Sequence, residues 1–326
     1  MTLPAAPLKF RPVVKQIIWG GRKLGKRLNK PIGDGDDYAE SWEVVDHGED
    51  QSVVDGGPCD GMTLGALLST YGERMLGRGV PHHQFPLLLK YLDCNRVLSV
   101  QVHPNDEYAG KMSPPDRGKT EAWYVVDADP GALIYAGLKE GVDREAFGAA
   151  IEAGRTEDVL HSFEPAVGDT VFIPAGTVHA LGAGLLIAEI QQSSDTTFRL
   201  FDWNRVDADG NARQLHLEQG LEVSDYTTGP IRPRSLDPAT GGWQTAVMSD
   251  KFALQLLHRG VGELPADDRF KIVTVPRGRA TLEGEGFSET LEAGQTRLLP
   301  AIAPETTVTV ADGGTVMAMT LPKPSA

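Results

Sequence analysis

Cysteine and long apolar runs are both scarce in this chain. Only Cys59 and Cys94 stand among 326 residues, too few for a disulfide framework, so we expect two reduced thiols. No apolar segment approaches the roughly 18 residues that cross a membrane as a helix. Residues 1–10 lack the basic-then-apolar pattern of a signal peptide. These absences predict a cytoplasmic protein with no membrane partner.

Positive charge is scarce as well. The chain has 31 Lys and Arg against 45 Asp and Glu, a formal net charge of −14. So acidic a chain repels nucleic-acid phosphates, which argues against a nucleic-acid partner. A site for a phosphate ester would have to gather its own cationic side chains. The sequence does not indicate the oligomeric state, and both a monomer and a weak dimer remain open.

Glycine and proline are plentiful, with 37 and 22 residues, and they separate many short Val, Ile and Leu runs. This composition favours a turn-rich β protein. Helices are expected at 63–77, where Thr63 can be the N-cap, and at 143–163, where Asp143 can be the N-cap. Strands are expected at 86–92, 96–103 and 120–126, the first two as neighbours.

Two β units are indicated by composition and by an internal echo. Residues 224–242 are rich in Pro, Gly, Ser and Thr and are interpreted as a linker or long connecting loop. Gly and Pro stand six apart around a short apolar strand at 168–174 and again at 294–300. We therefore predict one domain over 1–235, with the helices, and a second over 236–326.

Polar residues at strand spacing form a candidate metal site. Gln101 and His103 are two apart, as are Lys119 and Glu121, so each pair lies on one face of its strand, and neighbouring strands would bring the pairs into one patch. With His179, this patch holds the two-histidine, one-carboxylate set of many catalytic metal sites. The alternative is that each is an ordinary hydrogen-bonded residue. The remaining histidines lack such company and are expected to be structural or on the surface: His47, His82, His83, His161, His216 and His258.

Longer motifs resemble known families. The spacing Gly-x5-Pro-x-Gly-x-x-His that ends at His179 resembles the second motif of the cupin superfamily, although Ala183 stands where that motif often has Asn. Three stretches resemble type I mannose-6-phosphate isomerases, most of all their shorter bacterial members, and Glu-Ser-Trp-Glu at 40–43 also fits. These stretches are LSVQVHPND at 98–106, GKTEAWY at 118–124 and AEIQQSSDTTFRLFDW at 188–203. The resemblance spans residues 17–203.

This resemblance implies a mainly β fold of two cupin units, each a jelly-roll β-sandwich, with a few helices inserted in the N-terminal part. It also implies that only the first unit binds metal, as one zinc ion per chain. The implied ligands are Gln101, His103, Glu121 and His179, with the part of Gln101 left open. The implied catalytic residues are Arg199 and Glu189, and the implied substrate-binding residues are Lys90, Lys119 and Asp195.

The implied reaction interconverts mannose 6-phosphate and fructose 6-phosphate through an enediol. A Lewis-acid metal stabilises negative charge that develops beside the carbonyl. Arg199 stays protonated and can hold the enediolate oxygens. Three candidates for the base remain open: Glu189, Asp195 and a hydroxide at the metal.

Alternatives remain at the level of residues and of function. Arg199 could instead form a structural salt bridge with Asp195 or Asp202. Phe201 and Trp203 share strand parity with Arg199 but are interpreted as packing residues beside the site. The chain could also be another metal-dependent cupin enzyme, such as an oxygenase, or a cupin that binds a sugar phosphate without turnover.

Overall fold

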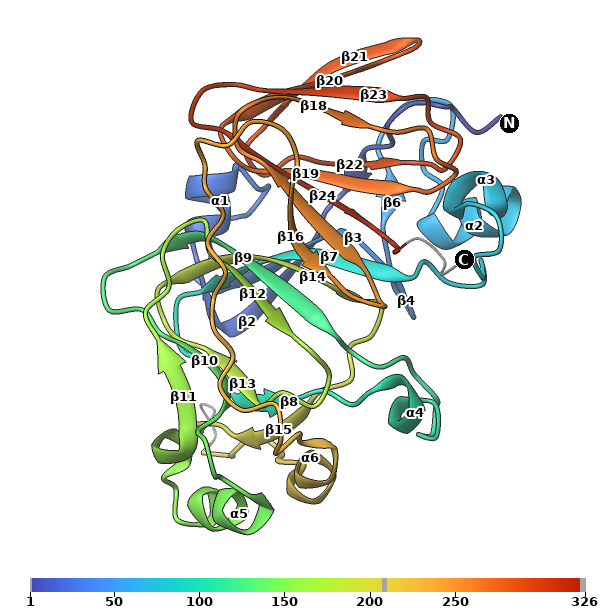
Figure 1. The fold of residues 1–326 in the computed structure, drawn as a ribbon. Coiled ribbons are helices and arrows are strands. Elements are labelled where there is room, and N and C mark those ends of the chain that lie inside the picture. The colour runs from blue at the N-terminus through green and yellow to red at the C-terminus, as the bar shows by residue number, and fades with distance from the viewer. Residues whose placement is uncertain (1, 207–209, 323–326) are drawn as a thin grey trace.

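The computed structural model describes residues 2–206 and 210–322 (Figure 1). Most of the regular structure is β, and the α-helices that the structure describes all precede the C-terminal strands, so the mainly β prediction is confirmed. These helices are α1 (Lys23–Leu28), α2 (Leu64–Tyr71), α3 (Glu73–Leu76), α4 (Asp106–Ala109), α5 (Arg144–Glu152) and α6 (Leu217–Val223). None of them is long and apolar enough to cross a membrane.

The N-terminal unit is a sandwich of a six-stranded and a five-stranded sheet. The order in the larger sheet is β12-β9-β14-β7-β3-β2, and in the smaller sheet β11-β10-β13-β8-β15. The larger sheet contains β2 (Val13–Gly21), β3 (Tyr38–Val44), β7 (Leu87–Cys94), β9 (Glu121–Ala128), β12 (Thr170–Ile173) and β14 (Leu185–Gln192). The smaller sheet contains β8 (Val100–Val102), β10 (Ile134–Leu138), β11 (Leu160–Phe163), β13 (His179–Leu181) and β15 (Phe198–Phe201).

The C-terminal unit repeats this plan with sheets in the orders β16-β17-β24-β19-β22 and β18-β23-β20-β21. The first contains β16 (Gln244–Met248), β17 (Ala253–Leu257), β19 (Lys271–Arg277), β22 (Thr296–Leu299) and β24 (Thr315–Thr320). The second contains β18 (Gly260–Leu264), β20 (Arg279–Gly284), β21 (Phe287–Glu292) and β23 (Thr306–Val310). Short pairs join β1 (Phe10–Arg11) to β6 (Val53–Val54) and β4 (Asp46–His47) to β5 (Asp50–Gln51). The prediction of two cupin units is confirmed.

The two units stack, so that the six-stranded sheet lies between two cores (Figure 1). Every residue of β7 and β14 is buried, as expected for strands covered on both faces. Leu89 and Tyr91 of β7 face the second unit, where the Tyr91 hydroxyl lies 2.7 Å from Thr274 Oγ1 on β19. Because side chains alternate along a strand, Lys90 faces the interior of the first sandwich.

Both predicted helices exist, but each ends earlier than expected. Thr63 Oγ1 accepts a hydrogen bond from the Ala66 N–H at 3.1 Å, so it is the N-cap. Gly72 has φ +45° and breaks the helix into α2 and α3. Asp143 likewise caps α5, which ends before Gly154, whose φ is +66°. The end of the predicted second helix forms a 3-10 turn and the edge strand β11.

The strands predicted as neighbours at 86–92 and 96–103 belong to different sheets, so that prediction is wrong. Between β7 and β8 the chain crosses the sandwich. The Arg96 N–H bonds the Trp19 carbonyl in the six-stranded sheet at 3.0 Å, and the Leu98 N–H bonds the Leu181 carbonyl of β13 at 2.8 Å. Two residues therefore suffice to change sheets.

The Pro- and Gly-rich segment at 224–242 connects the two units without being a free linker. Arg234 and Thr170 exchange backbone hydrogen bonds of 2.8 and 2.9 Å, and the Asp225 N–H bonds the Gly176 carbonyl at 2.8 Å. The start of the chain also reaches the second unit, because Leu8 and Leu298 form a β-bridge. The division into domains at residues 235 and 236 stays a prediction.

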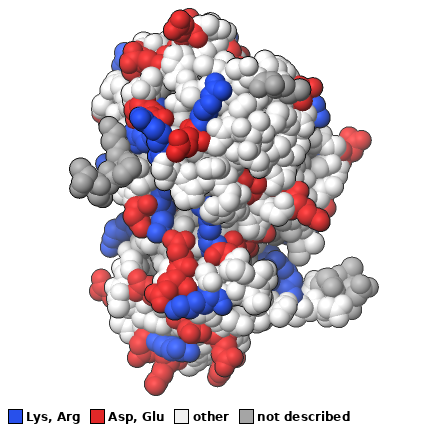
Figure 2. Space-filling view, turned by 90° about the vertical axis from the view of Figure 1, so that its right-hand side faces the viewer, with Lys and Arg blue, Asp and Glu red and all other residues white. Residues whose placement is uncertain are grey.

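Figure 2 shows acidic and basic side chains interspersed on one face, with no extended basic patch there. Positive charge that could attract a phosphate ester is instead found inside the first sandwich.

Candidate metal and substrate site

Three strands of the six-stranded sheet carry one row of polar side chains. Glu189 on β14 pairs with Lys90 on β7 and with Trp123 on β9. Residues paired across antiparallel strands share a face, so the three side chains lie side by side on the interior face of the sandwich. Lys90 Nζ lies 3.4 Å from Glu189 Oε1, and Trp123 Nε1 donates to Glu189 Oε2 at 3.0 Å.

The opposite sheet carries a second row. Gln101 on β8 pairs with His179 on β13 and with Arg199 on β15. The predicted patch of Gln101, His103, Lys119 and Glu121 does form, but across the sandwich and not along one sheet, since β8 and β9 belong to different sheets. This corrects the expectation that neighbouring strands would bring them together.

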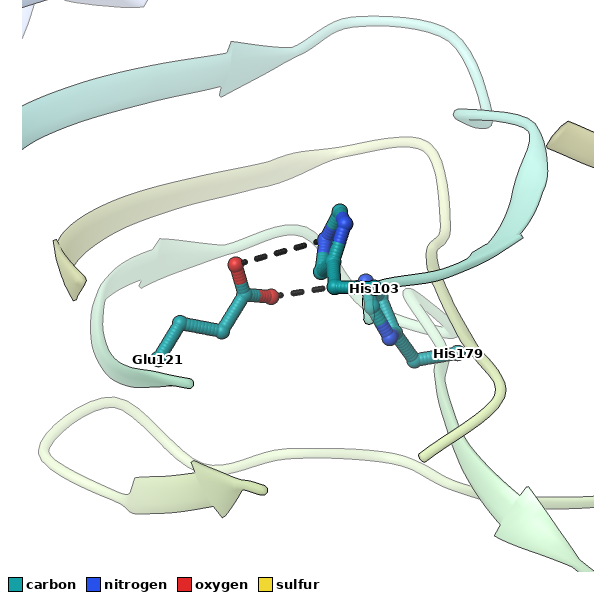
Figure 3. Close-up of side chains that lie close together, drawn as sticks. All are labelled: His103, Glu121 and His179. Atoms are coloured by element: carbon teal, nitrogen blue, oxygen red, sulfur yellow. Dashed lines mark ion pairs between the residues drawn. The ribbon is translucent and has the colours of Figure 1, made fainter. Parts of the chain in front are cut away.

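His103, Glu121 and His179 form the candidate metal centre. One possible ligand atom of each lies within 4.8 Å of the others. Glu121 Oε2 is 3.6 Å from His103 Nε2, and Glu121 Oε1 is 3.4 Å from His179 Nε2, so the carboxylate faces both imidazole rings (Figure 3). All three residues are about 1% exposed. Among the described residues, no second group of His, Cys, Asp and Glu meets the same geometry.

Backbone carbonyls orient both imidazole rings. His103 Nδ1 lies 2.9 Å from the Thr196 carbonyl, and His179 Nδ1 lies 2.8 Å from the Thr177 carbonyl. Because a carbonyl only accepts hydrogen bonds, each Nδ1 carries the proton and each Nε2 presents its lone pair to the centre. Gly176, with φ +89°, donates its N–H to the His103 carbonyl at 2.8 Å and so joins the two histidine segments.

The centre fits a divalent cation. Glu121 Oε1 is buried and has no hydrogen-bond partner, and burying such a group without a partner is costly. The Lys119 ammonium contacts Glu121 Oε2 and lies 3.1 Å from His103 Nε2, so a cation already stabilises this donor set. Gln101 Nε2 is 3.3 Å from His179 Nε2, which puts the amide beside the same nitrogen.

Burial sets the protonation of the centre. It lowers the pKa of His103 well below its usual range and that of His179 to about 4, so both rings are neutral at pH 7. Burial, followed by the charge of Glu189, raises the pKa of Glu121 to about 7. Neutral imidazole is the form that binds a metal, and a bound cation favours the ionised carboxylate.

Glu189 lies between two ammonium groups. Burial raises its pKa, but Lys119 and Lys90 outweigh this effect and lower it to about 2. Burial also lowers the pKa of Lys90, and the carboxylates of Glu189 and Glu40 reverse that effect and raise it. Lys90 and Lys119 are both under 10% exposed, so neither is a solvated surface charge.

A cavity of about 420 Å³ opens between the two rows, and Gln101, Lys90 and Glu189 line it. Asp195 is exposed at its wall and has no hydrogen-bond or ion-pair partner among the described residues. Sugar phosphates are of a size to enter such a cavity.

Arg199 lines the cavity and forms no ion pair with a carboxylate of the described residues. Its Nε donates to Ser99 Oγ at 3.3 Å and its Nη1 to the Gln214 carbonyl at 3.0 Å. Burial, then the nearby charge of Arg213, lowers its pKa. The alternative of a structural salt bridge is not seen in the described residues, because Asp202 instead contacts Arg205 and Arg213.

The strand parity expected after Arg199 is wrong. The register between β15 and β8 shifts between Arg199 and Phe201, which is a β-bulge. Phe201 therefore packs in the core with Val100 and Leu200, while Trp203 packs against its edge and donates Nε1 to the Leu98 carbonyl at 2.6 Å. Their interpretation as packing residues holds.

Several cavity residues were missed by the sequence analysis. Glu40 contacts Lys90 Nζ at 3.3 Å and accepts from Trp42 Nε1 at 2.5 Å, although the sequence marks Glu40 only as part of the Glu-Ser-Trp-Glu motif. Arg213 lines the cavity from the connection after β15. No periodic pattern marks Arg213, and only the need for local positive charge could have suggested it.

Stacked β-sandwiches with a buried two-histidine, one-carboxylate centre in one interior define a two-unit cupin with a candidate metal site. The family model of the type I phosphomannose isomerase catalytic domain matches residues 8–131. Mannose-6-phosphate isomerase ManA of Bacillus subtilis is 41% identical over 229 residues, covering 69% of this chain and 70% of the relative. Mannose-6-phosphate isomerase of Streptococcus mutans is 39% identical over 235 residues, covering 72% of each.

The solved structures agree with the sequences. The crystal structure of the mannose 6-phosphate isomerase from Bacillus subtilis superposes with a TM-score of 0.84 at 30% identity, covering 96% of this chain and 99% of that one. The chain belongs to the type I phosphomannose isomerase family, as its motifs predicted.

Proposed function

We propose that the protein interconverts mannose 6-phosphate and fructose 6-phosphate in a zinc-dependent reaction in the cytoplasm. The observation that carries this proposal is the buried centre of His103, Glu121 and His179 beside a cavity that Arg199 lines. The names of the relatives supply the substrate.

One zinc ion per chain would be held by His103, Glu121 and His179, with Gln101 as the fourth protein ligand. Two neutral histidines and one carboxylate leave a site with net positive charge. When bound, the metal supplies Lewis-acid stabilisation of negative charge on the substrate oxygens.

Arg199 is assigned to the enediolate and Arg213 to the phosphate. Arg199 pairs with Gln101 across the strands and so lies next to the metal ligands. Arg213 lines the cavity from the connection between β15 and α6, and 34% of its side chain is exposed. Lys90 and Lys119 would orient the sugar hydroxyls, since nearby carboxylates already neutralise their charges.

The two remaining roles are assigned to the carboxylates of Glu189 and Asp195. A carboxylate with a pKa of about 2 is a weak base, so Glu189 would act by holding Lys90 and Lys119 in place beside the substrate. Asp195 is at the cavity wall with both oxygens free of hydrogen bonds among the described residues. We assign proton transfer between C1 and C2 to Asp195.

A coupled assay of fructose 6-phosphate formation from mannose 6-phosphate tests the function directly, with dioxygen uptake followed in parallel. Isomerisation without oxygen consumption supports the proposal. Oxygen consumption without isomerisation would identify an oxygenase, and binding without turnover would identify a sugar-phosphate-binding cupin. Either result overturns the proposed function.

A further inference from the structure

The orientation of His103 depends on a turn outside the regular strands. The Thr196 carbonyl, which accepts the His103 Nδ1–H, lies in the turn at 193–197 between β14 and β15. A carbonyl in a turn orients a ligand only if the turn itself is fixed. The orientation of His103 therefore depends on the contacts that hold this turn.

Asp116, in the loop between α4 and β9, holds it. Its Oδ2 accepts hydrogen bonds from Ser194 Oγ at 2.8 Å and from Thr196 Oγ1 at 2.6 Å. The Ser194 hydroxyl oxygen in turn accepts the Thr196 N–H at 3.2 Å. Hydrogen bonds to an ionised carboxylate are stronger than neutral ones, so one side chain fixes the turn at two points.

Asp116 is itself anchored by its loop. Its N–H donates to the Ala109 carbonyl at 3.1 Å, and its Oδ1 accepts the Arg117 N–H at 2.7 Å. Both carboxylate oxygens are therefore used, one inside the loop and one across to the turn. This geometry explains two residues of the Ser-Ser-Asp-Thr-Thr stretch, Ser194 and Thr196, that have no place in the proposed chemistry.

The same turn also shapes the cavity. Asp195 and Thr197 stand on either side of Thr196, and both line the cavity. Fixing Thr196 therefore fixes the acceptor of a proposed metal ligand and the position of the proposed base together.

We propose that Asp116 is a positioning residue that sets metal affinity through Thr196 and His103, an inference that rests on the metal site of the proposed function. Loss of an outer group that orients a ligand commonly weakens metal binding by about 10- to 100-fold. Asp116 does not touch the metal ligands, so its effect must pass through the turn.

The test is the zinc dissociation constant, measured by competition with a chromogenic chelator, for the wild type, Asp116→Ala and Asp116→Asn. We expect about 10- to 100-fold weaker zinc binding for Asp116→Ala. A smaller loss is expected for Asp116→Asn, because the amide keeps one acceptor oxygen. Glu107→Gln is the matched control, since exposed Glu107 lies in α4 and its carboxylate bonds Lys111 and no other side chain that the structure describes. It should bind zinc as the wild type does.

A second variant keeps the inference testable if Asp116→Ala does not fold. Thr196→Val keeps the carbonyl but removes the hydroxyl that Asp116 holds, and it should weaken zinc binding in the same direction. Zinc affinity within threefold of the wild type in both folded variants, even with a lower melting temperature, would overturn the inference and leave the proposed function standing. If the wild type itself binds no zinc, the proposed function fails first.

Discussion

The two cupin units share their strand order but differ in what fills them. β12 and β22 are matching edge strands, each following a glycine with positive φ, Gly168 and Gly294, and they pair with β9 and β19. The internal echo in the sequence therefore marks equivalent strands. The registers of these pairs allow the interiors to be compared residue by residue.

The registers relate three charged residues of the site to positions in the second unit, and each of these positions holds a different residue there. Through the paired registers, Glu121 corresponds to Lys271, Glu189 to Ala318 and Lys90 to Gln255. The interior of the second sandwich is filled by Leu, Val and Ala side chains. β23, the counterpart of the strand that begins with His179, contains no histidine.

The two units therefore show that the same backbone architecture can be built with or without the polar site. A β-sandwich interior is apolar by default, and the second unit keeps that default. The first unit can hold two lysines and two glutamates inside because each charge has an opposite partner within 3.4 Å. Substitutions that disturb this charge balance or the histidine pair should therefore have much larger effects than control substitutions in the second unit.

The largest effect is expected for His179→Ala. Removing a ligand should weaken zinc binding by more than the roughly 100-fold seen when only an outer group is lost, and isomerase activity should fall with metal content. Metal analysis of the dialysed protein and the coupled assay measure both. The control is His258→Ala in the second unit, whose half-buried ring contacts Thr315. If the two variants lost metal equally, the assignment of the site to the first unit would fail.

The second-largest effect is expected for Arg199→Ala. It removes the guanidinium that faces the cavity, and losing a hydrogen bond to a charged group costs about 1.5–3 kcal/mol, or about 10- to 150-fold in kcat/KM. Steady-state kinetics at fixed pH measure the effect. Arg277→Ala, an exposed arginine of the second unit, should leave kcat/KM unchanged. Activity of Arg199→Ala within a few-fold of the wild type would contradict a catalytic role.

Glu189→Gln should destabilise the fold. It leaves Lys90 and Lys119 with less opposing charge in a buried site, and breaking a buried pair costs about 3–5 kcal/mol. Urea unfolding of the metal-free protein measures the free energy of unfolding. Glu292→Gln in the second unit breaks an exposed pair with Arg279 and should cost about 1 kcal/mol or less. Equal losses would show that the buried cluster is no more coupled than a surface pair.

The pH dependence of that difference is a finer test. The pKa of Glu189 is lowered from 4.5 to about 2 in the folded protein, so its stabilisation is fully present above pH 4.5 and is lost as pH falls toward 2. The gap in unfolding free energy between the wild type and Glu189→Gln should therefore shrink across this window. Urea titrations at several pH values measure it. A gap that stayed constant below pH 4.5 would mean that Glu189 does not titrate with a lowered pKa.

The sequence predicted that the three candidate ligands lie together, and it could do so because its signals are local. Strand spacing marked His103 and Glu121, and the Gly-Pro turn motif marked His179; these three do meet. Lys119 and Glu189, which the resemblance places beside the substrate, both line the cavity.

What the sequence could not predict depends on contacts between sheets. The crossing between β7 and β8 rests on backbone hydrogen bonds from Arg96 and Leu98, which leave no pattern in side-chain hydrophobicity. The bulge after Arg199, which brings Phe201 into the core, likewise leaves no pattern in side-chain hydrophobicity. Arg213 and Asp116 act as single residues in loops, where neither period nor spacing identifies a role.

We propose that one buried centre in the first unit makes this fold an isomerase. The most direct measurement is the zinc content and the mannose 6-phosphate isomerase activity of the same protein sample before chelation, after chelation and after zinc is added back. We expect about one zinc per chain, loss of activity with the metal and recovery with zinc. Full activity in the metal-free protein would contradict the proposed zinc dependence of the isomerase.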